Sequence, residues 1–577
     1  MINVVDNLDL VELPSQRLKY SWTNGKIAGH EIRAKLDRGI ANSDWWHLFP
    51  NADMKILPQN SSDHSPILLN SKGCSSFTRK LFRFEAIWTR DRRNHWVVEH
   101  AWAKGFHAKP STRLCKSLFH TRRGLSVWNK NQFGKVQLQI KNIKQALTDY
   151  QANNDDVDAG YRDKDLRCQL DELLKHEELL WFQKAKIQWR LEGDRCSRFF
   201  FMTTMVRKKS NRIDCLKLDD GEWIYSRNHI GNLFTALFES VFDSPTHPPP
   251  FDLSAIVDPI IPGEENLELL WIPTWDEVRD VVFSMGAFKA PGPDGMPALF
   301  YKTYWNIVGW DLVATVREVF MIDTMAHSIN DSNIVLIPKK PNPTRPNHFR
   351  PITVCNVAYR VVTKILANKL KPLLDRIVCP TQNAFVPSRS IHDNYVLIQE
   401  VIHSMKKKKG TLGWMALKID LEKAYDRVSW QFIKKVLTTF GFDPRWVRWV
   451  STCISSANMK LLINGSHFRD TKPRRGLRQG DPLSPYLFIL CTEILSRLFN
   501  NKVDNGTIHG LKLTRRGLPL HHLLFADDIF VFGKACATEA SSIKDTLDTF
   551  CSWSGLSFNN SKSSIFFSVN TRRVVAN

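Results

Sequence analysis

Apolar residues recur every three or four positions between residues 136 and 150 and again between 166 and 180. This spacing places them on one face of an α-helix, so each stretch predicts a long amphipathic helix. Between the two stretches lies Ala152-Asn-Asn-Asp-Asp156, a cluster of turn-forming residues. We therefore expect two long helices that pack against each other as a hairpin.

The pattern changes along the chain and predicts three segments. Residues 1–70 have the pattern of short strands and turns, whereas residues 71–250 are mainly helical. Four prolines between 245 and 250 disfavour regular structure, and we interpret them as a domain boundary. Residues 265–577 mix helical and strand patterns. The expected fold class is therefore α+β.

Two strongly apolar segments carry carboxylates. Leu523–Phe532 has the pattern of a hairpin with Asp527 and Asp528 in its middle, and Trp414–Asp420 predicts a strand that ends in a third carboxylate. Strands this apolar are expected to be buried on both faces, where isolated carboxylates cost several kcal/mol each. A divalent cation removes that cost, and Mg²⁺ takes oxygen ligands. The three aspartates therefore predict a two-metal site for phosphoryl transfer.

Each carboxylate also has an ordinary explanation. An Asp-Asp pair is common at an exposed hairpin tip, and a single Asp such as Asp420 often caps the end of a strand. The apolar residues on both sides of Asp527 and Asp528 argue against an exposed tip. The presence of two such segments favours metal ligation over capping.

Positive charge is concentrated in one part of the chain. The 577 residues carry a formal net charge of +22, and residues 71–150 hold 17 Lys and Arg against 4 Asp and Glu. Such a concentration attracts phosphate backbones through counterion release. Aromatic residues, Trp96 and Phe106 among them, lie between these charges, as a surface for single strands requires. The alternative is a packed helical pair with a solvated basic face.

Several classes of protein are disfavoured by composition. The chain has no run of about 18 apolar residues, so we expect no membrane span. Its start lacks the pattern of a secretory signal. The 11 cysteines are scattered without CxxC spacing, so we expect neither a zinc site nor a disulfide framework. We expect an intracellular protein, with nuclear residence left open.

Six signatures in order resemble the reverse transcriptase of plant LINE-type (non-LTR) retrotransposons. They are Lys289-Ala-Pro-Gly-Pro-Asp-Gly295, Phe349-Arg-Pro-Ile352, Asp420 with Lys423-Ala-Tyr-Asp426, Arg475-Gly-Leu-Arg-Gln-Gly-Asp-Pro-Leu-Ser-Pro485, Phe525-Ala-Asp-Asp528 and Ser554-Gly-Leu-Ser-Phe-Asn-Asn-Ser-Lys-Ser563. The resemblance implies a right-hand polymerase with fingers and an antiparallel palm sheet at 265–577. It also implies that residues 71–250 are a basic helical connector.

The resemblance assigns a role to each residue that matches a signature. Asp420 and Asp527 would bind two Mg²⁺ ions, with Mn²⁺ as the alternative, helped by Asp528 and the carbonyl oxygen of Leu421. The remaining matched residues would handle the nucleotide: Arg350 on the triphosphate, Tyr425 under the sugar, Gln479 and Gly480 along the pocket, and Lys562 as the proton donor to pyrophosphate. Tyr425 stands where this family more often has Phe.

Further cations are expected near nucleic acid or nucleotide. Arg474, Arg475 and Arg478 are predicted to meet template or primer phosphates. Lys339 and Lys340 either add charge near the triphosphate or lie on a loop surface.

The first segment resembles the closing part of an apurinic-type endonuclease. Ser62-Asp-His-Ser-Pro66 matches its last motif, so His64 would be the general base, Asp37 would orient it and Asp63 would assist at the phosphate. About 70 residues cannot rebuild such a sandwich alone. We expect a remnant without nuclease activity. At the other end, the thumb and the zinc-binding tail of the family are expected to be missing.

The function predicted from these residues is RNA-directed DNA synthesis. A primer 3′-OH would attack the α-phosphate of a deoxynucleoside triphosphate, with an RNA template and a DNA primer as partners. One alternative is an inactive nucleic-acid-binding relic of such an element. A group II intron maturase shares the palm signatures, but the endonuclease resemblance favours the LINE arrangement.

Overall fold

The computed structural model describes residues 10–571 except 14, 19, 27–29, 50–51, 60–61, 73–80, 134–135, 153–158, 186–196, 244–250 and 515–516. The prolines expected to mark a boundary at 245–250 and most of the turn expected at 152–156 lie outside these residues. Among the described residues, no helix combines the length and apolar character that crossing a membrane requires.

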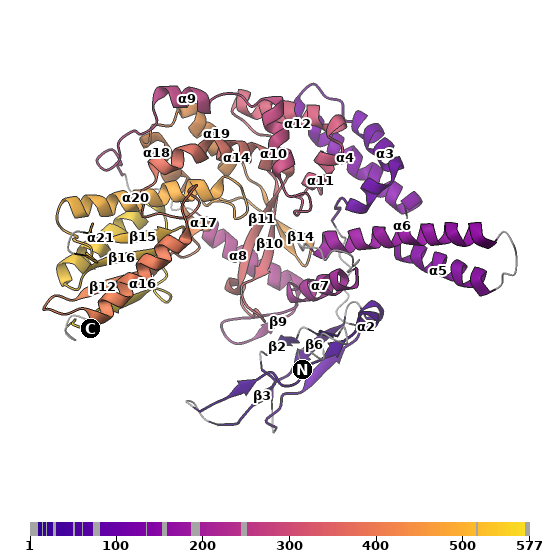
Figure 1. The fold of residues 1–577 in the computed structure, drawn as a ribbon, viewed down its shortest axis with the longest axis horizontal. Helices are drawn as coiled ribbons and strands as arrows, with labels where there is room; N and C mark the ends of the chain where they lie inside the picture. The colour runs from indigo at the N-terminus through magenta and orange to yellow at the C-terminus, as the bar shows by residue number, and fades with distance from the viewer. Residues whose placement is uncertain are drawn as a thin grey trace.

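A four-stranded antiparallel sheet in the order β15-β16-β12-β17 forms one end of the molecule (Figure 1). Its strands are β12 (Trp414–Asp420), β15 (His522–Phe525), β16 (Asp528–Lys534) and β17 (Ser564–Phe567). The helices associated with it are α16 (Ile391–Lys407), α20 (Ser484–Asp504) and α21 (Ala537–Ser554). This arrangement confirms the predicted strand at 414–420 and the predicted hairpin at 523–532.

Alternate residues of these strands point to opposite faces, as strand geometry requires. Ile419, Ile529 and Val531 face the main core together with residues of α20 and α21. Ala416 and Phe532 face a smaller cluster built with α16. The sheet is therefore covered on both faces, which explains why its strands are almost continuously apolar.

A second four-stranded sheet has the order β11-β10-β13-β14. Its strands are β10 (Ser332–Pro338), β11 (Phe349–Cys355), β13 (Met459–Ile463) and β14 (Ser466–Thr471), and β10 pairs with β13 in parallel. Asn464 and Gly465 turn between β13 and β14 with φ angles of 53° and 83°. Both central residues of this tight turn are left-handed, which is why Asn-Gly stands there. The sheet packs on α8 (Arg227–Phe242).

Helices from the middle segment pack directly on the segment at 265–577. α3 (Arg92–Ala103) and α4 (Pro110–Trp128) lie beside α12 (Trp305–Ile322) and share its hydrophobic core. Trp102 Nε1 donates a 2.8 Å hydrogen bond to Asp311, and the Ser111 amide donates one of 2.7 Å to Glu318. The connector expected at 71–250 is thus continuous in packing with the region that follows it.

The predicted helical hairpin is confirmed. α5 (Val136–Ala152) and α6 (Ala159–Ala185) run side by side and project from the rest of the molecule (Figure 1). The end of α6 returns to the core, where Leu180 is buried.

The first segment consists of short strands, as expected. They are β1 (Val11–Glu12), β2 (Ser15–Arg17), β3 (Trp22–Thr23), β4 (Arg33–Ala34), β5 (Ile40–Ala41), β6 (Asp53–Ile56) and β7 (Ile67–Asn70), with helix α2 (Ser43–Leu48). Leu13, Trp46 and Met54 form a small core that is completed by Met202 and Met205 of α7 (Ser197–Ser210). The segment therefore depends on α7 for part of its core.

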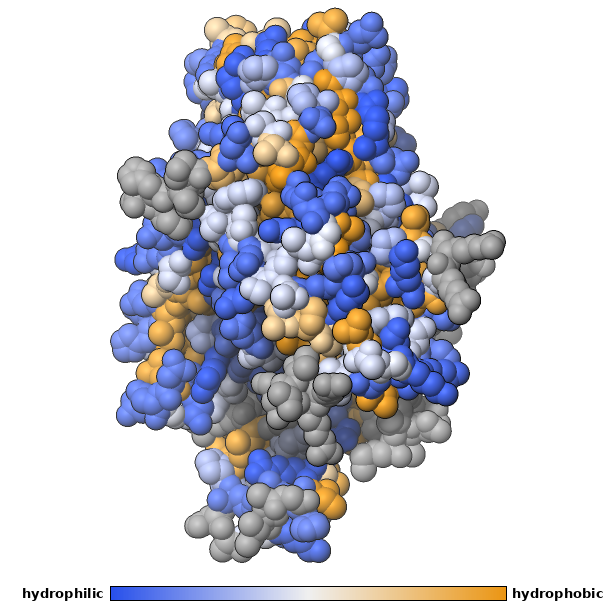
Figure 2. Space-filling view, turned by 90° about the vertical axis from the view of Figure 1, so that its left-hand side faces the viewer, coloured by the Kyte–Doolittle hydropathy of each residue, from blue (hydrophilic) through white to orange (hydrophobic). Residues whose placement is uncertain are grey.

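The other described elements connect these layers. They are η1 (Ala86–Arg90), η2 (Asn129–Phe133), β8 (Leu216–Lys217), β9 (Trp223–Ile224), α9 (Gly263–Leu269), α10 (Trp275–Ser284), α11 (Ala298–Thr303), α13 (His327–Asn330), η3 (Pro346–His348), α14 (Val357–Leu370), η4 (Lys371–Leu373), α15 (Leu374–Ile377), α17 (Ala424–Arg427), α18 (Trp430–Thr439) and α19 (Pro444–Ser455). Figure 2 shows that the face at the β12–β16 end is mainly hydrophilic, with apolar residues gathered in bands between the polar ones.

Candidate active site

The register of β12 and β16 brings two of the predicted carboxylates together. Asp420, the last residue of β12, lies directly opposite Asp528, the first residue of β16. Side chains at such positions have Cβ atoms about 4.5–5.5 Å apart. Like charges directly opposite each other are unfavourable, so the arrangement favours a cation between them.

The third carboxylate lies on the loop that joins β15 to β16. Phe525 pairs with Asp528, so Ala526 and Asp527 form a two-residue hairpin loop. Ala526 has a φ of 55°, a left-handed conformation that costs a non-glycine residue roughly 1–2 kcal/mol. The buried side chain of Gln382 accepts a 3.2 Å hydrogen bond from the Ala526 amide and so supports this conformation.

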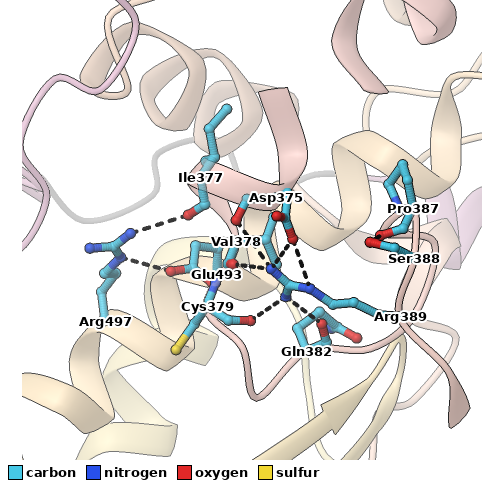
Figure 3. Close-up of polar contacts among 10 residues, drawn as sticks. All are labelled: Asp375, Ile377, Val378, Cys379, Gln382, Pro387, Ser388, Arg389, Glu493 and Arg497. Carbon is cyan, nitrogen blue, oxygen red and sulfur yellow. Dashed lines mark hydrogen bonds and ion pairs between the residues drawn. The ribbon is translucent and has the colours of Figure 1, made fainter. Parts of the chain in front are cut away.

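The segment that carries Gln382 is held in place by a buried polar network (Figure 3). Arg389 donates hydrogen bonds to the carbonyls of Cys379 and Gln382 at 2.7 and 2.9 Å. Glu493 of α20 accepts a 2.9 Å bond from the Cys379 amide and pairs with Arg497 at 2.7 Å. Sequence reasoning missed Gln382, Arg389 and Glu493. The polar run Thr381-Gln-Asn383 before an apolar stretch was the available signal.

The electrostatic state of Asp527 fits a site made for positive charge. The Asp527 side chain is exposed to water, but the protein around it partly desolvates the carboxyl. This partial burial raises the pKa of Asp527. The charges of Asp528 and Asp420 raise that pKa further. The expectation that both loop carboxylates are buried is wrong, because Asp527 and Asp528 are exposed at the hairpin tip. The apolar residues on either side point into the two faces of the sheet, whereas the tip itself extends beyond them.

The donor chemistry of the site suits hard divalent cations, although the side chains do not converge on one point. Among the residues that the structure describes, no group of three or more His, Cys, Asp or Glu side chains is close enough to hold a metal ion. The Leu421 carbonyl, the fourth predicted ligand, is not used in the bridge to Phe558. The bridge between Leu421 and Phe558 uses the Asp420 carbonyl and the Glu422 amide, so the Leu421 carbonyl points away from Phe558.

Of the predicted nucleotide residues in this region, Tyr425 lies near Asp527, and Gln479 and Gly480 lie against β11. Tyr425 stacks on Phe488 with ring centroids 4.7 Å apart, and burial raises the pKa of its hydroxyl, with a further contribution from Asp527. The Gln479 carbonyl accepts a 2.9 Å bond from the Thr353 amide of β11. Gly480 has a φ of 108°, and a Cβ there would lie 2.9 Å from the Thr353 carbonyl. Glycine is therefore required at 480 by the neighbouring strand.

Three cations surround the same edge. Lys562 Nζ lies 3.8 Å from Asp420 Oδ1, and its side chain is 66% exposed. Burial lowers the pKa of Lys339, and the charges of Lys562 and Arg350 lower it further. Arg350 is exposed on β11. Lys339 therefore lies near Asp420 and belongs to the cationic side of the site.

The prediction that Arg478 meets nucleic-acid phosphates is wrong. Arg478 is 5% exposed, donates a 2.8 Å hydrogen bond to the Cys453 carbonyl and lies over the ring of Tyr359 at 4.3 Å. Arg475 is half-buried and bonded to the Val241 carbonyl at 2.7 Å. Arg474 is exposed and lies 3.6 Å from Asp243. Of these three arginines, Arg474 is the one with an exposed side chain.

The first segment contains a separate pair of candidate residues. His64 Nδ1 lies 2.8 Å from Asp37 Oδ2, and this hydrogen bond raises the pKa of His64. Asp63 accepts a 2.9 Å bond from Trp22 Nε1. The contact between Asp37 and His64 that the resemblance implies is therefore present.

Comparisons with known proteins agree with this geometry. Residues 337–574 match the family described as reverse transcriptase (RNA-dependent DNA polymerase). The chain is 28% identical over 525 residues to the uncharacterized 149 kDa protein of transposon TX1 from Xenopus laevis, covering 87% of this chain and 38% of that protein. It is 29% identical over 319 residues to the Pol polyprotein of the retrotransposable element R2DM from Drosophila melanogaster, covering 55% and 28% of the two chains.

A shorter match comes from a plant. The uncharacterized mitochondrial protein AtMg01250 of Arabidopsis thaliana is 52% identical over 68 residues, which are 12% of this chain and 56% of that protein. The chain thus spans well under half of the length of the two transposon relatives. Residues 337–574 are a reverse transcriptase domain related to those of non-LTR retrotransposon proteins.

Proposed function

We propose that the chain copies RNA into DNA as part of a plant non-LTR retrotransposon. The observation that carries this proposal is the register of β12 and β16, which sets Asp420 opposite Asp528 with Asp527 on the adjoining loop. The match to the Arabidopsis protein supports a plant source. RNA templates and deoxynucleotides are found inside cells, which supports an intracellular place of action.

Each side chain near the carboxylates has a task in nucleotidyl transfer. Arg350 and Lys339 bind the triphosphate through charge-assisted hydrogen bonds. The Tyr425 ring, fixed against Phe488, lies under the sugar and excludes a ribose 2′-OH. Lys562 Nζ gives its proton to the departing pyrophosphate. Two Mg²⁺ ions held by Asp420, Asp527, Asp528 and the Leu421 carbonyl would supply stabilisation of the attacking and leaving oxygens.

The remaining parts of the chain have supporting roles. The basic helices of the middle segment bind the RNA template, and the primer is DNA. The first segment carries the closing motif of an apurinic-type endonuclease, to which Asp37, Asp63 and His64 belong.

Primer extension tests the proposal. The full chain, an RNA template, a DNA primer, Mg²⁺ and deoxynucleotides are expected to yield extended primer. The double variant Asp527→Asn/Asp528→Asn is expected to yield none while still binding RNA. Asp545→Asn, which changes an exposed carboxylate on α21, is the matched control and should retain activity.

The outcomes separate the enzyme from the relic. Equal extension by the double variant and the parent contradicts the assignment of the carboxylates. Salt-sensitive RNA binding without extension by the parent supports the relic, for which the incomplete grouping of the carboxylates is the favouring observation.

A further inference from the structure

A cavity of about 740 Å³ lies between α3 and α4, and none of the catalytic carboxylates lines it. In Figure 1 these two helices lie beside α12, at the opposite end of the molecule from the sheet that carries the carboxylates. The volume falls within the range of roughly 300–1,000 Å³ that small-ligand pockets occupy.

The floor of the cavity is apolar and rigid. It includes Val97 and Ala101 of α3, and Gly124 and Val127 of α4. A Cβ on Gly124 would lie 3.3 Å from the Ala101 Cβ, so glycine allows the two helices to approach closely. Val127 is 53% exposed, so its apolar side chain is accessible to a ligand.

One wall is a flat aromatic surface. Trp96 is 66% exposed, and it stacks on His100 one turn later with ring centroids 5.2 Å apart and planes 6° from parallel. Parallel rings on one helix face make a surface on which a further flat ring can stack. Base–aromatic stacking contributes about 1–3 kcal/mol per base in single-strand binding.

The rim of the cavity is positively charged. Lys104 and Arg123 are exposed, and neither forms an ion pair within the described part of the chain. Arg93 is partly neutralised by Asp91 at 2.6 Å. No Asp or Glu lines the cavity, and α4 contains no acidic residue.

We propose that this cavity binds one base of a single-stranded nucleic acid, stacked on Trp96, with Lys104 and Arg123 holding the neighbouring phosphates. The apolar floor receives the face or edge of the base, and the rim follows the backbone on both sides. An acidic peptide would satisfy the cations but would leave the flat aromatic wall without a matching ring. This assignment concerns binding alone and does not require the polymerase to be active.

The test measures binding of a labelled single-stranded RNA of about 16 nucleotides, a length that such sites commonly cover. The full chain is titrated without Mg²⁺ or deoxynucleotides, so a failure of synthesis cannot affect the result. Trp96→Ala is expected to weaken binding about 5- to 150-fold and to leave the salt dependence unchanged. Trp96→Phe, which retains a stacking ring, should recover most of the affinity.

Charge and stacking are separated by a second variant. Lys104→Ala/Arg123→Ala should reduce the slope of log affinity against log salt by about 1.4, since each single-strand phosphate contact contributes about 0.7. Trp310→Ala is the control, because Trp310 is 71% exposed on α12 and does not line the cavity. DNA of the same sequence shows whether the site requires a ribose.

Three results would overturn the proposal. Trp96→Ala could bind no more weakly than Trp310→Ala, which would leave the aromatic wall without a role. Trp96→Ala could weaken the binding of duplex RNA as much as that of the single strand, which would show that no base enters the cavity. Poly-glutamate could displace the labelled RNA, whose binding depends on Trp96, as effectively as unlabelled RNA does. The cavity would then be a site for acidic protein.

Discussion

The sheet that carries Asp420 and Asp528 and the strands of the first segment obtain their stability in different ways. The strands β12 and β16 are seven residues long and are covered on both faces by helices. The first segment has strands of two to four residues and completes its core with residues of α7. Both segments nevertheless bring two predicted site residues together, Asp420 opposite Asp528 in the sheet and Asp37 beside His64 in the first segment.

The two regions differ in how firmly the surrounding structure positions the residues of their sequence motifs. Asp420 and Asp528 are positioned by seven consecutive cross-strand pairs, so their geometry follows from the whole sheet. Asp37 and His64 are held by their own hydrogen bond, a single bridge to Trp22 and a bond to Ser21, and the His64 side chain is 45% exposed. A site that aligns reacting groups needs the first kind of support. The catalytic role is therefore proposed for the sheet, and the first segment is proposed as a remnant.

The largest difference between the two regions is expected in synthesis. Asp420→Asn removes one negative charge from the carboxylate edge and should reduce primer extension by about a thousandfold or more, because several kcal/mol of transition-state stabilisation are lost. Asp37→Asn, the matched change in the first segment, should leave extension unchanged. A similar loss in both variants would contradict the separation of the two regions. Single-turnover extension rates provide the measurement.

A second difference is expected in stability. Ile529 and Trp46 are both fully buried, the first in β16 and the second in α2. Ile529→Ala should lower the free energy of unfolding of the main body by about 2–5 kcal/mol, as measured by urea denaturation. Trp46→Ala should instead increase hydrogen exchange within residues 10–72 and leave the main transition in place. Loss of the main transition in Trp46→Ala would mean that the first segment is part of one cooperative unit.

Local patterns predicted much of this architecture, and long-range contacts account for what they missed. The α5–α6 hairpin and the two strands on either side of the 526–527 loop follow from neighbouring residues alone. Its motif predicts that Arg478 binds phosphate. In the structure Arg478 instead bonds to Asn330, which lies 148 positions away in the sequence.

The same reason explains why the sequence did not reveal Gln382 as the residue that supports the loop at Ala526 and Asp527. Gln382 lies 144 positions before Ala526, whose amide it binds, and nothing in the spacing of the sequence relates the two. Exposure of the Asp527 and Asp528 carboxylates was also missed, because apolar periodicity describes the strands and says little about the tip that extends beyond them.

The network behind that loop should make stability depend on pH. Burial raises the pKa of Glu493 to about 7, so the folded protein holds a proton there that the unfolded chain releases at lower pH. This contribution to stability is complete below the unfolded pKa and is lost as pH rises toward about 7. Urea unfolding at about pH 5 and about pH 8 should therefore show a loss on the order of 2–3 kcal/mol at the higher pH. Glu493→Gln, which keeps an acceptor for the Cys379 amide, should remove this part of the pH dependence. An unchanged dependence in that variant would assign it to other groups.

The smallest expected effect concerns the pair in the first segment. The hydrogen bond to Asp37 raises the pKa of His64, and the charge of Asp37 adds to it. Asp37→Asn should therefore lower the pKa of His64, as NMR titration of the imidazole would show, without a measurable change in unfolding, since exposed ion pairs contribute about 0–1 kcal/mol. Asp44→Asn changes an exposed carboxylate of α2 that, among the described residues, does not act on His64, and it should leave the His64 pKa unchanged. Equal pKa values in the parent and Asp37→Asn would mean that the contact does not persist in solution. The two regions would then differ further, because strand register would hold Asp420 opposite Asp528 whereas the first segment would not hold Asp37 beside His64.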